Sequence, residues 1–394
     1  MTFYHGVIAG RIARDGTHYS VAPRGRGITQ LGHVRSEYWK THPDEEQQNP
    51  SALARGLVAG TADSPVGWTW DIDCPSALDL SEYHNVDVLV LYTPQAFNDY
   101  GGSVTAVTAV MKAAINDAND ALINSGIEHV RYILVGVEAA PPLPPSQSYD
   151  LPTIVDARNS VAGIFEDSPP NSCSVVPNNP VRALRDAYHA DVVALARVPT
   201  DLIDNSCGVT WVQRRVAGVC VVEPGAAWEK FSYLVFRPGC SEDRLNLAHE
   251  LGHVLGMEHD PQNSPLANIS FGQAAPSCPW SFGHRQRGAI TSYPFRTVMS
   301  YHDSVTPGGY SSGPAPCSNS NDCPQIDAYA NPALEYRGPV NNINPYSAGV
   351  YPRIGVPGVS TPASNAWDTL QRIGPIVAQF RARPDLIFAH GFEQ

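Results

Sequence analysis

The chain has 394 residues, a formal net charge of -12 and 43% hydrophobic residues, enough for about two domains with a substantial buried core. The acidic balance and the lack of a dense basic stripe argue against nucleic acid as a partner, because phosphate binding needs clustered Lys and Arg. No apolar run approaches the roughly 18 residues of a membrane-spanning helix, so we expect a soluble protein.

Residues 1–83 are expected to form a small β-rich segment. FYHGVIAGRI and THYSVAPRGRGITQLG alternate apolar and polar residues between Gly, Asp and Pro breaks, a pattern typical of short strands and hairpins. THPDEEQQNPS is polar and turn-rich, as in a linker or an exposed loop. No signal peptide is visible. The protein is then either cytoplasmic or exported with a leader outside this sequence.

From Val86 onward the pattern alternates between strands and helices, which predicts an α/β (α+β) domain with helices packed on a mixed, twisted sheet. VDVLVLYT is a nearly continuous β-branched and Leu run, typical of a strand buried on both faces. The further elements expected in chain order are a helix over 104–124, the strand HVRYILVGVEA, helices near 154–164 and 181–190, the strands ADVVALAR and FSYLVF, and a helix over 244–256.

Beyond that last helix the composition turns to Pro, Ser, Asn and Gly with little periodicity, and SNAWDTLQRIGPIVAQFRAR then predicts a closing helix. So long an irregular stretch in a compact domain usually has a functional reason. We therefore divide the main domain, 84–383, into an upper part, 84–256, and an irregular lower part, 257–383. Residues 384–394 are expected to be a C-terminal tail.

The segment HELGHVLGMEHD, residues 249–260, predicts a metal site. His249 and His253 are four residues apart on a helix, so both imidazoles can reach one ion from consecutive turns. Gly256 can adopt positive φ, end the helix and turn the chain so that His259 becomes a third ligand. Three histidines leave the fourth zinc position open, which is typical of catalytic rather than structural sites.

Glu250 is the expected general base. It follows the first ligand and can reach a water molecule that the zinc activates, take its proton and pass it to a leaving amine. The other histidines, His284 among them, have no ligand spacing and are interpreted as surface or core residues.

H-E-x-x-H-x-x-G-x-x-H followed by a turn containing methionine resembles the metzincin clan of zinc peptidases. The turn is present as RTVMSYHD, and the resemblance implies that Met299 forms a hydrophobic floor below the metal without binding it. Asp260 after the third histidine is similar to reprolysin-like (adamalysin-type) enzymes. Further segments of this kind, some also similar to bacterial peptidyl-Asp metalloendopeptidases, are VDVLVLYTPQA, SCGVTWV, AYANPALEYRG and WDTLQRIGPIVAQFR.

Two features leave alternatives open. Many reprolysins have Pro two residues after the methionine, whereas this chain has Tyr301, as in astacins and serralysins. The resemblance implies that Tyr301 stabilises an oxyanion or acts as a movable ligand; the alternative is a tyrosine packed with its hydroxyl on a neighbour. FSYLVF is either the edge strand on which metzincins pair extended substrate or an interior strand.

The cysteines bear on export and on the N-terminal segment, which resembles the tail of a prodomain and would make the chain a zymogen. Eight cysteines without C-x-x-C pairs favour disulfides in an exported protein over buried thiols, although they allow 105 pairings. Cys74 is either an inhibitory thiolate on the open zinc position, or part of a disulfide or a buried thiol.

The sequence thus predicts a secreted or exported, zinc-dependent metalloendopeptidase with one catalytic Zn²⁺, acting as a monomer on extended polypeptides without a covalent intermediate. It gives no prediction for calcium. Two other classes remain: an inactive zinc-binding interaction module, and a zinc hydrolase of small amides.

Overall fold

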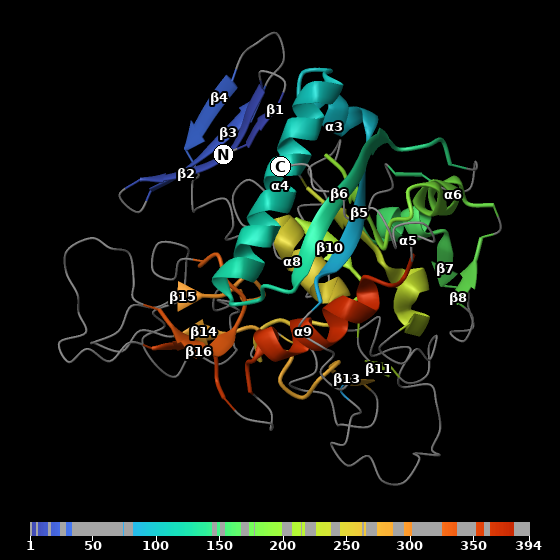
Figure 1. Cartoon of the computed structure of the whole chain (residues 1–394). Helices are drawn as coiled ribbons and strands as arrows, with labels where there is room; N and C mark the ends of the chain where they lie inside the picture. The colour runs from blue at the N-terminus through green and yellow to red at the C-terminus, as the bar shows by residue number, and fades with distance from the viewer. Residues whose placement is uncertain are drawn as a thin grey trace, which may run out of the picture.

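The computed structural model gives the arrangement of the elements over most of the chain (Figure 1). The residues that it describes are 2–4, 7–14, 17–23, 29–33, 74, 82–143, 148–149, 154–166, 173–176, 178–198, 207–213, 215–216, 226–237, 245–261, 264, 274–286, 295–301, 325–336, 352–357 and 363–381. The linker expected at THPDEEQQNPS and the tail 384–394 lie outside them.

A five-stranded sheet in the order β10-β12-β9-β5-β6 forms the centre. Its strands are β5 (His84–Tyr92), β6 (Val130–Ala139), β9 (Val192–Ala196), β10 (Gly208–Thr210) and β12 (Tyr233–Phe236). β6, β5, β9 and β12 pair in parallel, and β10 joins β12 antiparallel. The mixed α/β sheet expected from the sequence is therefore confirmed.

FSYLVF is an interior strand. β12, which carries this sequence, lies between β9 and β10, and the end of the sheet is β10 from the SCGVTWV segment. The edge-strand alternative for FSYLVF is thus wrong, because only the order of strands in space decides which strand has a free side.

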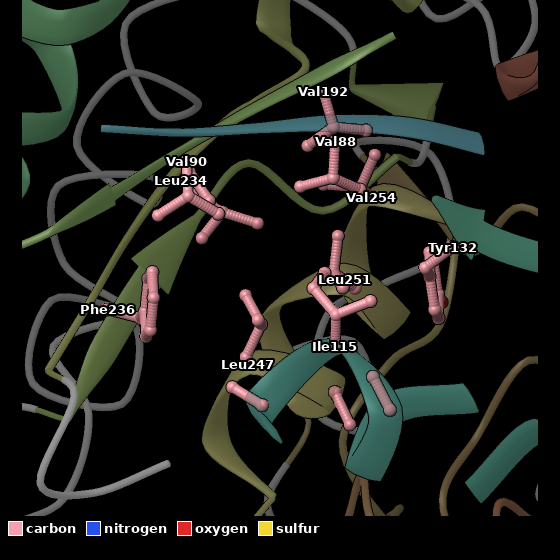
Figure 2. Close-up of a cluster of buried hydrophobic side chains, with 14 of the residues drawn as sticks. Val88, Val90, Ile115, Tyr132, Val192, Leu234, Phe236, Leu247, Leu251 and Val254 are labelled. Carbon is pink, nitrogen blue, oxygen red and sulfur yellow. The ribbon is translucent and has the colours of Figure 1, made fainter. Parts of the chain in front are cut away.

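Two helices, α4 (Val104–Asn124) and α8 (Asn246–Val254), pack together on one face of this sheet. Figure 2 shows their apolar side chains meeting those of the strands in one cluster: Val88, Val90, Ile115, Tyr132, Val192, Leu234, Phe236, Leu247, Leu251 and Val254. Every labelled residue of this cluster is buried. The metal-motif helix α8 is thereby fixed against the sheet by its apolar side.

The remaining helices lie around the sheet. They are α3 (Pro94–Asp99), α5 (Ile154–Ala162), α6 (Pro180–Ala187), the 3-10 helix η2 (Ala226–Phe231) and α9 (Ala366–Val377). Of these, α5 and α9 contact the strands of the sheet directly. The side chains of Ser103 and Asn179 accept hydrogen bonds from backbone N–H groups in the first turns of α4 and α6, the usual role of an N-cap. α9 packs against β5 and β6 and closes the domain (Figure 1).

The N-terminal residues form a separate antiparallel sheet beside α4 (Figure 1). Its strands are β1 (Thr2–Tyr4), β2 (Val7–Arg14), β3 (Thr17–Pro23) and β4 (Thr29–His33), which agrees with the short strands and hairpins expected there. A disulfide joins Cys74 to Cys278 across 204 positions of sequence, so this segment is covalently tied to the main domain. Among the helices of the described residues, none is long and apolar enough to cross a bilayer.

Between α8 and α9 the described parts of the chain have only short strands. They are β13 (Ala274–Ala275), paired with β11 (Arg215–Val216); β14 (Arg285–Gln286), paired with β15 (Phe295–Arg296); and β16 (Asn331–Glu335), paired with β17 (Arg353–Ile354). β7 (Ile164–Glu166) and β8 (Cys173–Val175) form one more small pair, beyond α5.

Candidate metal centre

The metal-motif helix ends where the sequence predicts a turn. α8 ends at Val254, and Gly256 has φ of +84°, a left-handed conformation that favours glycine. The N–H of Met257 donates to the carbonyl of Gly252 (3.0 Å), a six-residue closure typical of helix C-termini. The chain reverses there, and His259 comes back toward the helix that carries the first two histidines.

The structure brings the three histidines together. The Nε2 atoms lie 3.1 Å apart between His249 and His253, 2.9 Å between His253 and His259, and 3.2 Å between His249 and His259. All three rings are buried. Tetrahedral zinc with N ligands at about 2.0–2.1 Å requires N···N separations of about 3.3 Å, so the spacing is close to that of a zinc site.

The outer nitrogens of two of these rings are oriented by carbonyl oxygens. His249 Nδ1 lies 2.9 Å from the Val298 carbonyl oxygen, and His253 Nδ1 lies 2.7 Å from that of Met257. A carbonyl can only accept, so both rings carry their proton on Nδ1 and turn the Nε2 lone pair inward. Lone pairs that face one another at such distances repel, and a cation removes that repulsion. The donor set therefore fits a metal ion such as zinc.

Glu250 lies next to the first histidine and is buried, with 1% of its surface exposed. Its carboxyl group lies against Gly208 of β10: a Cβ atom built on Gly208 would be 2.4 Å from Glu250 Oε1. Asn246 in the first turn of α8 also donates to the Cys207 carbonyl at 2.6 Å. The end strand of the sheet thus lies directly against the expected general base, a proximity that the sequence does not indicate.

Met299 lies beside the helix that carries the ligands. Its sulfur would be 2.5 Å from a Cβ atom on Gly252, the residue before His253, and the side chain is fully buried. Tyr329 packs at the same glycine and donates its hydroxyl hydrogen to the Ala248 carbonyl at 2.6 Å. Gly252 therefore allows the methionine and the helix to approach closely.

Tyr301 and Asp260 meet at the third histidine. The Tyr301 hydroxyl lies 3.3 Å from His249 Nε2 and 3.2 Å from His259 Nε2. Asp260 has no exposed surface; its carboxylate accepts the backbone N–H of Tyr301 at 3.1 Å and pairs with Arg285 at 3.5 Å. All residues singled out in the motif and its methionine turn therefore lie within one cluster.

Cys74 forms a disulfide. Its sulfur is bonded to that of Cys278, and a disulfide sulfur is not a thiolate that could occupy a zinc position. The structure thus has the disulfide alternative and not the inhibitory thiol. Among the described residues no cysteine is free. The partnership with Cys278 has no sequence signal, because spacing alone cannot choose among pairings.

His284 is a core histidine, one of the two interpretations that its lack of ligand spacing leaves open. The residue is 8% exposed, and its ring packs against that of Phe295, with centroids 5.7 Å apart. Burial lowers the pKa of His284 from 6.5 to about 4, although a hydrogen bond with Gln286 acts in the opposite direction. The imidazole is therefore neutral near pH 7.

This lowered pKa predicts acid sensitivity. The unfolded chain binds a proton at His284 near pH 6.5, whereas the folded chain does so only near pH 4. His284 therefore costs the folded state nothing above pH 6.5, and the free energy of unfolding falls as the pH drops from 6.5 to 4. The loss approaches about 3 kcal/mol. Chemical denaturation at pH 7.5 and pH 5 should show a smaller pH-dependent loss for His284→Gln than for the parent protein. Equal losses in both proteins would contradict the assignment.

The region that contains this site is similar to known metallopeptidases. Residues 83–311 match the reprolysin model described as metallo-peptidase family M12. Two curated relatives named peptidyl-Asp metalloendopeptidase are each 22% identical. That of Xanthomonas campestris pv. campestris aligns over 65% of this chain and 46% of its own length, and that of Stenotrophomonas maltophilia over 84% and 62%.

The chain thus spans about half to three fifths of the length of these relatives. A solved structure of a chaperone–substrate complex shares 16% identity at a TM-score of 0.44, covering 77% of this chain and 40% of that one, which is too distant to bear on fold or function. The matched family region, in contrast, covers more than half of the chain and includes the three histidines, Glu250 and Met299. The protein belongs to metallo-peptidase family M12.

Proposed function

We propose that the protein is a zinc-dependent metalloendopeptidase with His249, His253 and His259 as the zinc ligands. The observation that carries this proposal is the convergence of three buried Nε2 atoms within 3.2 Å of one another, two of them on rings whose Nδ1 atoms face carbonyl oxygens. Three protein ligands leave one position for substrate or water. Zinc bound there supplies Lewis-acid chemistry, because it polarises a carbonyl group and lowers the pKa of water.

Glu250 is the general base. As a carboxylate it accepts a proton from the attacking water and donates that proton to the amine that leaves when the peptide C–N bond breaks. Its place one residue after His249 and its contact with Gly208 support this role, because both restrict the carboxyl group to one small region. Met299 supports the helix from below without binding the metal.

Substrates are extended polypeptides that pair with the outer edge of β10. The Cys207 carbonyl accepts from the N–H of Arg237 on the β12 side, at 2.7 Å. Backbone groups alternate sides along an antiparallel strand, so the N–H and C=O of Gly208 point away from β12. A substrate strand that bonds to Gly208 lies directly beside Glu250, which favours a polymeric substrate over a small amide.

We also propose that the enzyme is exported and that its chain is divided as expected from the sequence. The Cys74–Cys278 disulfide supports export, because such bonds persist in oxidising compartments. Residues 1–83 are a prodomain-like segment, 84–383 the catalytic domain in two parts, and the enzyme acts as a monomer. A cut on the C-terminal side of Cys74 leaves the N-terminal segment attached through this bond.

Metal removal tests the function. We expect the purified protein to contain one zinc per chain and to cleave denatured casein into peptides, and a chelator to abolish cleavage until zinc is restored. Mass spectrometry of the products identifies the cleaved bonds, and shows whether they involve Asp, as the relatives' names state for those proteins. Cleavage that persists in the chelated protein, or purified protein without zinc, would refute the proposal.

A further inference from the structure

The hydroxyl of Tyr301 lies 3.3 Å from His249 Nε2 and 3.2 Å from His259 Nε2, but these nitrogens are the proposed metal ligands and cannot also accept its hydrogen bond once their lone pairs bind an ion. The ring contacts His259 edge-on with centroids 4.6 Å apart and lies tilted against His249 at 5.5 Å. Ring contacts of this kind tolerate sliding, whereas a hydrogen-bond donor for an oxyanion must be placed to within a few tenths of an ångström. The position of the hydroxyl therefore depends on how the backbone of Tyr301 is held.

That backbone is bound at both ends of the residue. The N–H of Tyr301 donates to Asp260 Oδ2 at 3.1 Å, and its carbonyl oxygen accepts from Arg285 Nη1 at 3.1 Å. The other terminal nitrogen of Arg285 lies 3.5 Å from Asp260 Oδ1. The guanidinium thus closes a ring of contacts that runs from the carboxylate next to His259 to the carbonyl of Tyr301.

A second arginine holds the preceding residue. Arg296 is paired with Arg285 across the short strands β14 and β15, and its Nη1 donates to the Ser300 carbonyl at 2.8 Å. Burial lowers the pKa of Arg296 to about 9, although Asp260 acts in the opposite direction and Arg285 lowers it further. The group still carries its charge near neutral pH, so its bond to the Ser300 carbonyl is charge-assisted.

We propose that Arg285 is a positioning residue for Tyr301: it ties Asp260, adjacent to the third metal ligand, to the Tyr301 carbonyl and so sets where the hydroxyl lies. This inference rests on the proposed function, in which the hydroxyl donates to the oxygen of the substrate carbonyl as that oxygen gains negative charge. The two terminal nitrogens of the planar guanidinium contact the carbonyl and the carboxylate at a fixed spacing. A lysine ammonium keeps the charge but not this geometry.

A double-mutant cycle tests the proposal. Arg285→Met is expected to lower kcat for a fluorogenic peptide by about tenfold to hundredfold with KM changed less than about threefold, because the loss falls on the transition state. Tyr301→Phe should lower kcat at least as much. The double variant should be no worse than Tyr301→Phe alone, since Arg285 acts through the tyrosine.

Binding of a phosphinic peptide, which mimics the tetrahedral state, gives a readout independent of turnover. Calorimetry on zinc-loaded protein should show weaker binding in both single variants, with no further loss in the double variant. Arg372→Met is the matched control, because it removes a partly exposed Arg–Asp pair on α9 and should change neither kcat nor binding. If Arg285→Met does not fold, Arg285→Lys takes its place in the cycle, with a partial loss expected.

The positioning role would be overturned if the fold-losses in kcat of the two single variants multiplied in the double variant. Unchanged kcat and binding in the Arg285 variant would also overturn it. Failure of the proposed function looks different: the parent protein itself would then neither cleave the peptide nor bind the phosphinic analogue.

Discussion

Replacement of Glu250 by Gln is expected to lower kcat/KM for peptide hydrolysis by about 10²–10⁴-fold, while zinc content stays at one per chain. The amide has the size of the carboxyl group but cannot accept the proton of the attacking water. The ligands His249 and His253 keep their carbonyl partners, because neither bond involves Glu250. The variant should therefore retain the metal and lose the base.

The measurement combines initial rates on a fluorogenic peptide with metal analysis of the same samples. Glu258→Gln is the matched control: it makes the same substitution at another carboxyl group of the motif, which is also 1% exposed. The Glu258 carboxylate lies 3.3 Å from the Ser264 hydroxyl and has no proposed contact with substrate. A Glu250→Gln enzyme with more than about a tenth of parental activity, or equal losses in both variants, would exclude Glu250 as the base.

The core of the site could be predicted from the sequence because its geometry is local. His249 and His253 are one helical turn apart, and Gly256 provides the left-handed residue that turns the chain toward His259. The methionine turn required the resemblance to metzincins, since nothing in its own spacing brings Met299 against Gly252. Distances along the chain predict contacts within one helix and its end, and little beyond.

Other parts of the site depend on tertiary structure. FSYLVF is the more apolar strand, yet the edge against Glu250 is formed by Gly208–Thr210, whose three residues give almost no periodic signal. Arg285 contacts Asp260 only because two short strands bring it there. The pairing of Cys74 with Cys278 is likewise one of many pairings that the sequence allows.

Two elements begin later than the sequence predicts, and the backbone shows why. α8 begins at Asn246 and not near residue 244, because Leu245 has φ of +59°, a conformation that a bulky residue adopts only when the surrounding fold enforces it. β12 begins at Tyr233, after the 3-10 helix Ala226–Phe231 has used the start of the apolar run. Propensity alone cannot reveal either constraint.

Gly256→Ala is expected to damage both folding and metal binding. A side chain at φ +84° costs about 1–2 kcal/mol. The new Cβ would also lie 2.6 Å from Ser277 Oγ and 2.8 Å from Ser277 Cβ, and such overpacking adds about 1–3 kcal/mol. Any shift that relieves this contact moves the turn that leads to His259. Zinc affinity should therefore fall by about 10–100-fold, the scale typical of disturbed support around a metal site.

Gly126→Ala separates the effect of backbone strain from that of overpacking. Gly126 has a similar φ of +73°, but a Cβ atom there would be 3.6 Å from its nearest neighbour, Asn331 Nδ2. Chemical denaturation should show a loss of about 1–2 kcal/mol for Gly126→Ala, from backbone strain alone, and a larger loss for Gly256→Ala. Competition with a zinc-binding dye should show weakened affinity in Gly256→Ala only. Equal zinc affinity in the two variants would mean that the Gly256 turn does not position His259, and that His259 reaches the other two histidines by packing of its own.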